Sequence, residues 1–147
     1  MAVVAQENVE DFDFSVLQMV MMGRYAHKKL FQGDNAEDTR ICEHALETVG
    51  LLHLRDRSFL SLSGGEKQRI AMARSFAFPS KILLLDEAFQ SLDEKIKKFL
   101  GQTLKKLLSE SPKTVIFVTH EKSEAKEIAD ITVEMEGEPL KISSSFS

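Results

Sequence analysis

The sequence predicts an α/β domain with a largely parallel sheet. Two short apolar segments, residues 82–85 and 114–119, are continuous rather than alternating, which is typical of strands buried on both faces. Between them, Ile96, Leu100 and Leu104 recur at helical spacing. A strand, a helix and a second strand of this kind in succession indicate an α/β arrangement.

The composition limits the classes of protein to which the chain can belong. Its 147 residues suit one domain, and 43% hydrophobic with 29% charged residues is the balance of a globular protein. A formal net charge of −4 argues against a general basic surface, so we expect no nucleic-acid partner. No apolar stretch approaches the roughly 20 residues that cross a bilayer. The single cysteine, Cys42, fits a reducing cytoplasm.

The part of the chain before these strands is predicted to be helical. Residues 12–62 contain no convincing strand and are interpreted as a helical insertion. Ser15 can cap its first helix, and Gly23 is the expected stop of that helix. Asp34 or Asn35 can cap the second helix.

The remaining elements follow from local patterns. Ser91 and Glu94 have the spacing of a capping box at the start of the helix between the strands. Residues 121–129 are predicted to form another helix. Apolar residues alternate within residues 131–142 on both sides of a Glu-Gly-Glu turn, which predicts a hairpin at the end of the chain.

The segment LSGGEKQR at residues 62–69 carries the sharpest local signal. Ser63 and Glu66 have capping-box spacing, and Gly64 and Gly65 leave the N–H groups of the first turn bare. A helix start with bare N–H groups, a hydroxyl and the positive end of the helix dipole favours an anion such as phosphate. An ordinary capped helix would account for the same residues.

Polar residues at the ends of the two strands form a second group. Asp86 and Glu87 follow the first apolar run, at the edge of a parallel sheet where ligands usually bind. Asp86 could hold Mg²⁺, which prefers oxygen ligands, and Glu87 could orient or deprotonate an attacking water. His120 follows the second run and could hydrogen-bond a terminal phosphate or position a water. Two solvated acids and a structural histidine are the simpler alternatives.

Together, these segments resemble the nucleotide-binding subunit of an ABC transporter. The resemblance covers the chain from residue 3 to about residue 135 and rests on LSGGEKQR, ILLLDE, SLD at residues 91–93 and VTHE at residues 118–121, in the family's order. Ala88-Phe89 stands where the family usually has Pro-Thr. Phe14 and the segment at residues 22–27 are similar to importers of metal chelates such as ferric siderophores and vitamin B12.

The resemblance implies a site for ATP and Mg²⁺. Asp86 would be the Walker B aspartate, holding Mg²⁺ together with Gln6, the Q-loop glutamine. Glu87 would be the base that activates water for attack on the γ-phosphate, and His120 the switch histidine on that phosphate. The implied nucleotide-binding residues are Gln6, Ser63, Gly64, Gly65, Glu66 and the D-loop aspartate Asp93.

The resemblance also implies an organisation and partners. Residues 1–11 would form the Q-loop strand and loop, residues 12–62 the helical subdomain, and residues 63–147 the signature helix, Walker B strand, D-loop, H-loop and C-terminal hairpin of the ATPase core. In the family, two such subunits sandwich ATP and bind membrane permease subunits. We therefore expect a homo- or heterodimer that is cytoplasmic and peripheral on the inner face of the cell membrane.

One family motif, G-x-x-x-x-G-K-[ST], has no counterpart in the sequence, because none of the seven glycines is followed by Lys. That loop cradles the phosphates and supplies a hydroxyl to Mg²⁺. The expectation is a chain that lacks the phosphate-binding loop and its strand, with little or no ATPase activity alone. The missing strand would lie between the strands that end at His120 and begin at Ile131. Their bare edges would then pair in a swapped dimer, take up a segment supplied in trans, or collapse together.

Two functions fit this pattern. The first is an ATP-binding subunit of an ABC-type importer, in which ATP hydrolysis drives transport of a metal chelate or similar solute. The alternative is a non-catalytic module that docks on a permease or dimerises, and contributes only its signature segment to a partner's ATP site.

Overall fold

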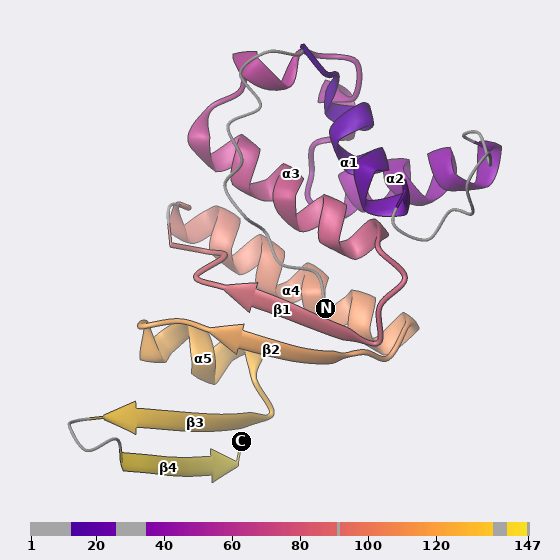
Figure 1. The fold of residues 1–147 in the computed structure, drawn as a ribbon. Helices are drawn as coiled ribbons and strands as arrows, with labels where there is room; N and C mark the ends of the chain where they lie inside the picture. Colours follow the sequence, from indigo (N-terminus) through magenta and orange to yellow (C-terminus); the bar gives the residue numbers. More distant parts are fainter. Residues whose placement is uncertain (1–12, 26–34, 91, 137–140, 147) are drawn as a thin grey trace.

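The computed structural model describes residues 13–25, 35–90, 92–136 and 141–146 (Figure 1). The strand and loop expected at residues 1–11, with the candidate residue Gln6, lie outside these ranges. The described elements, in chain order, are α1 (Val16–Tyr25), α2 (Ala36–Thr48), the 3₁₀ turns η1 (Leu52–Leu54) and η2 (Phe59–Ser61), α3 (Gly64–Ala77), β1 (Ile82–Asp86), α4 (Glu94–Glu110), β2 (Thr114–Val118), α5 (Lys122–Ile128), β3 (Ile131–Glu136) and β4 (Lys141–Phe146).

Helix α1 has a cap at its start, but it does not end where the sequence predicts. The Ser15 hydroxyl accepts a hydrogen bond from the Gln18 N–H at 3.2 Å, and Gln18 Oε1 accepts one from the Ser15 N–H at 2.8 Å. The predicted stop at Gly23 is wrong, because α1 continues to Tyr25 with Gly23 buried inside it. Gly23 faces the backbone of α3, so its role is close helix packing rather than helix termination.

Helix α2 is capped by one of its two predicted candidates. The Asn35 side chain accepts a hydrogen bond from the Asp38 N–H at 2.7 Å, whereas Asp34 lies outside the described residues. Asp38 is itself buried and accepts a hydrogen bond from Arg24 Nε at 2.9 Å. Arg24 also donates to the carbonyl oxygen of Ala77 at 3.0 Å, so one guanidinium joins α1, α2 and the end of α3.

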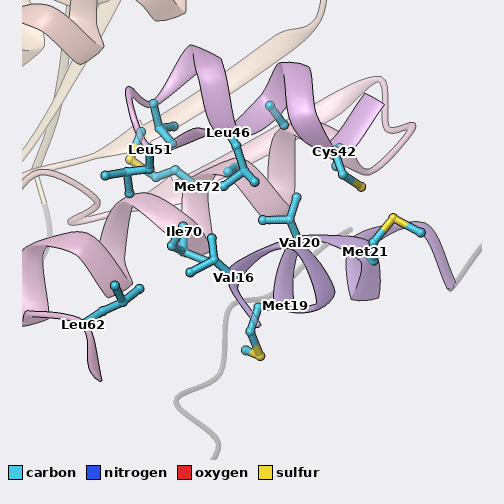
Figure 2. Packing of buried hydrophobic residues seen from close by; sticks show 14 of the residues in the cluster. Val16, Met19, Val20, Met21, Cys42, Leu46, Leu51, Leu62, Ile70 and Met72 are labelled. Atoms are coloured by element: carbon cyan, nitrogen blue, oxygen red, sulfur yellow. The ribbon is translucent and has the colours of Figure 1, made fainter. Parts of the chain in front are cut away.

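One hydrophobic cluster joins α1, α2 and α3 (Figure 2). Val16, Val20 and Leu46 are fully buried in it, and Ile70 of α3 packs among them. The same cluster includes Phe89, which lies just beyond the end of β1. The core of the helical part therefore also positions α3 relative to the carboxyl end of β1.

The predicted parallel pairing is confirmed, since β1 and β2 form a two-stranded parallel sheet in which their last residues, Asp86 and Val118, are register partners. Because the strands are parallel and aligned, the residues that follow them emerge at the same edge of the sheet.

The predicted burial of these strands on both faces is wrong. Leu83 and Leu85 are 5% and 4% exposed and pack against Leu104 of α4. Ile82 and Ile116 belong to the opposite face and are 52% and 51% exposed. Helices therefore cover only one face of this sheet in the part of the chain that the structure describes.

The start of α4 also differs from the prediction. Asp93, and not Ser91, is the N-cap, and its side chain accepts a hydrogen bond from the Ile96 N–H at 3.0 Å. Asp93 directly precedes the first helical residue, so Glu94 occupies the first helical position and cannot be the third residue of a capping box.

The predicted C-terminal hairpin is confirmed, since β3 and β4 pair antiparallel as a second sheet. In Figure 1, β3 points in the same direction as β1 and β2, but no ladder joins β2 to β3 among the described residues. Ile131 and Val133 of β3 are 55% and 53% exposed. Within the described ranges, one edge of β2 and one edge of β3 therefore have no partner strand.

No helix in the described ranges combines the length and apolar character that crossing a membrane requires.

Candidate functional site

Residues that follow β1 and β2 meet at the shared carboxyl edge of the parallel sheet. The Glu87 N–H donates to the carbonyl oxygen of Val118 at 2.9 Å, which extends the contact between the strands by one residue. The His120 Nδ1 atom lies 3.4 Å from Glu87 Oε1. The two side chains are 59% and 44% exposed, so both are accessible to a ligand. The sequence-predicted base and histidine are therefore brought together.

The backbone at Glu87 has an uncommon conformation. Its φ of 47° lies in the left-handed region, which a non-glycine residue adopts at an energetic cost. Two hydrogen bonds hold this turn through the Glu87 carbonyl oxygen, one from the Gln90 N–H at 3.1 Å and one from Gln68 Nε2 at 3.3 Å. Gln68 belongs to α3, so this helix directly contacts the turn that carries Glu87.

Asp86 is the last residue of β1, and its carboxylate is exposed. An accessible carboxylate at this edge suits Mg²⁺, which is commonly held by one or two carboxylates together with waters and phosphate oxygens. The described residues contain no group of three or more His, Cys, Asp or Glu side chains that could hold a metal.

The predicted capping box at the start of α3 is confirmed. The Ser63 hydroxyl accepts from the Glu66 N–H at 3.3 Å, and Glu66 Oε2 accepts from the Ser63 N–H and hydroxyl, each at 2.8 Å. The backbone and side-chain hydrogen bonds from Ser63 hold the pKa of Glu66 below its usual 4.5. The Glu66 carboxylate therefore already places a negative charge at the start of α3, where the positive end of the helix dipole stabilises it.

In the part of the chain that the structure describes, no neighbouring atom requires glycine at position 64. A Cβ atom placed on it would meet no atom within 4 Å, and Gly50 is the glycine with positive φ in the described part of the chain. Glycine costs stability in a helix relative to alanine. An open glycine in the first turn of α3, next to Gly65, leaves room for an external group to approach the backbone.

Asp93 is exposed, and the hydrogen bond from Ile96 gives its carboxylate a local role as the cap of α4. The structure thus assigns local contacts to Ser63, Glu66 and Asp93 and brings Glu87 to His120, and it leaves Gln6 unplaced.

Sequence reasoning missed two polar residues next to this site. Gln68 contacts the Glu87 turn, and Lys97 of α4 pairs with Glu121, the residue after His120. Gln68 stands in the LSGGEKQR segment, but no local pattern predicts its partner. The partner of Lys97 is 24 positions away, a separation that only the tertiary structure closes.

Comparisons with known proteins agree on one family. The family model described as ABC transporter matches residues 1–90. The manganese transport system ATP-binding protein MntA of Synechocystis is 37% identical over 135 residues, which are 90% of this chain and 52% of the relative. The sulfate/thiosulfate import ATP-binding protein CysA of Escherichia coli is 50% identical over 90 residues, 61% of this chain and 25% of the relative.

A solved structure supports the same grouping. A chain described as the inward-facing conformation of a metal-chelate type ABC transporter superposes with a TM-score of 0.79 at 34% identity. The match covers 94% of this chain and 56% of that one. The chain therefore spans about half, or less, of the length of the proteins that it matches.

Proposed function

The chain belongs to the ABC transporter family, and we propose that it acts as part of an ATP-binding subunit of an importer. The observation that carries this proposal is the 3.4 Å contact between Glu87 and His120 at the carboxyl edge of the sheet. The exposed carboxylate of Asp86 belongs to the residue directly before Glu87 in the chain. A base, a histidine and an oxygen ligand side by side suit phosphoryl transfer to water.

Each of these residues would have a distinct task in hydrolysis. Glu87 would accept a proton from the attacking water, and His120 would hydrogen-bond the terminal phosphate that the water attacks. Asp86, with Gln6, would hold Mg²⁺, which when bound neutralises charge on the phosphates. The left-handed turn held by Gln68 and Gln90 would keep the Glu87 carboxylate beside His120.

The nucleotide site would be completed by residues outside these 147. No G-x-x-x-x-G-K-[ST] sequence is present to cradle the phosphates. The open surface at Gly64 supports a second contribution, in which Ser63, Gly64, Gly65 and the start of α3 face an ATP molecule held by another subunit. Asp93 and Glu66 would lie at the edges of such a composite site.

The transported solute and the membrane partner belong to the same proposal. The manganese relative and the metal-chelate structure favour a metal chelate or similar solute, and they cover nine-tenths or more of this chain. The sulfate relative matches a shorter part of it. We propose that the subunit works on the cytoplasmic face of a membrane, bound to permease subunits.

ATP hydrolysis by a completed assembly tests this function. The purified chain is mixed with a polypeptide that supplies the phosphate-binding half of MntA, and Mg²⁺-dependent phosphate release is measured. Hydrolysis is expected in the mixture, with a drop of about 10²-fold or more when Glu87 is changed to Gln. Glu47→Gln, at an exposed acid on α2, is the matched control and should leave the rate unchanged. A complex in which Glu87→Gln hydrolyses ATP as fast as the parent would overturn the proposal.

The absence of a phosphate-binding loop favours one second candidate, a non-catalytic module that lends only its signature segment to a partner's ATP site. Nucleotide titration of the chain with and without an intact ATPase of the family separates the two. Tighter binding in the mixture that is lost in Gly64→Val, together with a rate of phosphate release that Glu87→Gln leaves unchanged, favours this module.

A further inference from the structure

Lys97 lies in a mostly buried cluster of charged side chains between α4 and α5. Its side chain is only 10% exposed, and its Nζ atom lies 2.8 Å from Glu124 Oε1 and 2.9 Å from Glu121 Oε1. Pairing with Glu124 first and Glu121 second raises the pKa of Lys97. Pairing with Lys97 lowers the pKa of Glu121, so ammonium and carboxylate are both charged at neutral pH.

The cluster includes the backbone on both sides of His120. The Thr119 hydroxyl donates to Glu124 Oε2 at 2.7 Å, and the Glu121 N–H donates back to that hydroxyl at 3.0 Å. Thr119 and Glu121 are the immediate neighbours of His120 in the chain. His120 makes its 3.4 Å contact with Glu87 from a segment that is held at each end.

The cluster also reaches the first turn of α4. The Lys97 N–H donates to the carbonyl oxygen of Asp93 at 2.9 Å, and Asp93 caps that helix. Lys97 thus links the first turn of α4 to the segment that carries His120. Removing its ammonium would leave Glu121 and Glu124 close together without their shared cation, which is strongly unfavourable for partly buried carboxylates.

We propose that Lys97 is a positioning residue for His120, fixing the contact of the imidazole with Glu87 by holding Glu121 and Glu124. Among the described residues Lys97 forms ion pairs with acids of α4 and the His120 segment and none with Glu87, so it acts through the Thr119–Glu121 segment. The chemical importance of this positioning rests on the proposed function, but the positioning itself is a property of the chain alone.

The test measures how strongly His120 senses Glu87. The ring resonances of His120 are recorded by NMR in the parent chain and in Glu87→Gln, and the resulting shift is compared in Lys97→Met, Lys97→Arg and Lys105→Met backgrounds. Lys105 is an exposed lysine of the same helix and is the matched control. The shift caused by Glu87→Gln should be lost in Lys97→Met, largely kept in Lys97→Arg, and unchanged in Lys105→Met.

A folded Lys97→Met chain whose His120 still shows the full Glu87→Gln shift would overturn the proposal and leave Lys97 with a purely structural role. If Lys97→Met does not fold, Glu121→Gln applies the same test, because it weakens one of the two ion pairs and leaves the size of the side chain nearly unchanged. A reduced shift supports the proposal and a full one overturns it. No nucleotide is needed, so an assembly without ATPase activity would contradict the proposed function and leave this result unaffected.

Discussion

A Cβ atom on Gly23 would lie 2.4 Å from the carbonyl oxygen of Arg74, closer than Cβ atoms approach non-bonded atoms in proteins. Because the obstacle is backbone, α1 and α3 would have to separate to admit an alanine. Gly23→Ala should therefore lower the free energy of unfolding by about 1–3 kcal/mol, measured by urea denaturation.

Gly101→Ala is the matched control for that measurement. Its Cβ would lie 3.6 Å from the Ile128 side chain, an ordinary contact distance, and Gly101 is also a buried helical glycine. Replacing it should raise stability by about 0.5–1 kcal/mol through helix propensity. An equal loss in both variants would show that the approach of Gly23 to Arg74 is not the cause.

Gly64→Ala separates stability from function. No atom of the described residues obstructs the new methyl group, so the free energy of unfolding should stay the same or rise by up to about 1 kcal/mol. In a mixture with an intact ATPase of the family, the same variant should weaken the effect of this chain on nucleotide binding. Isothermal titration of both proteins with nucleotide measures this, and an undiminished effect would remove Gly64 from the proposed contact surface.

The Ser63–Glu66 capping box predicts a dependence of stability on pH. Hydrogen bonds from Ser63 lower the pKa of Glu66 in the folded chain below 4.5, so folding favours the ionised carboxylate. The stabilisation is complete above about pH 4.5 and is lost as the pH falls through the lowered pKa. Glu66→Gln keeps a capping side chain but cannot ionise. The stability advantage of the parent over Glu66→Gln should therefore shrink as the pH is lowered, and a constant difference in urea unfolding would contradict this.

The open edges of β2 and β3 predict self-association of the isolated chain. Ile116 of β2 is 51% exposed, beside a backbone edge with no partner strand in the described part of the chain. A charge there should disfavour pairing, so Ile116→Lys should shift the chain towards monomer in sedimentation velocity. Leu60→Lys makes the same change at an apolar residue that is 47% exposed and lies outside the sheets. Equal effects of both changes, or a monomeric parent, would rule out association through this edge.

Features that depend on a few neighbouring residues were predictable from the sequence. The Ser63–Glu66 box and the Asn35 cap are hydrogen bonds within one turn of helix, so spacing alone defines them. The parallel pairing of β1 and β2 and the meeting of Glu87 with His120 follow from two apolar strands joined by a helix. Here the order of elements along the chain was sufficient.

Features that depend on tertiary packing were not predictable. Glycine commonly ends a helix, but Gly23 lies inside α1, where it allows the backbone of α3 to approach closely. Asp93 and Ser91 are both good caps, and which one begins α4 depends on where the chain leaves β1. The partners of Gln68 and Lys97 are distant in sequence, so their contacts with the Glu87 turn and with Glu121 appear only in the fold.

The register between β1 and β2 connects the hydrophobic core to the chemistry at the edge of the sheet. Leu83 and Leu85 fit against α4 in only one alignment of the strands, because a slip of one residue would turn them to the opposite face. That alignment also sets how far Glu87 stands from His120. Under the proposed function, selection for hydrolysis would therefore also constrain Leu83 and Leu85, which do not contact the nucleotide. A substitution in this core would then abolish activity although every polar residue of the site was still present.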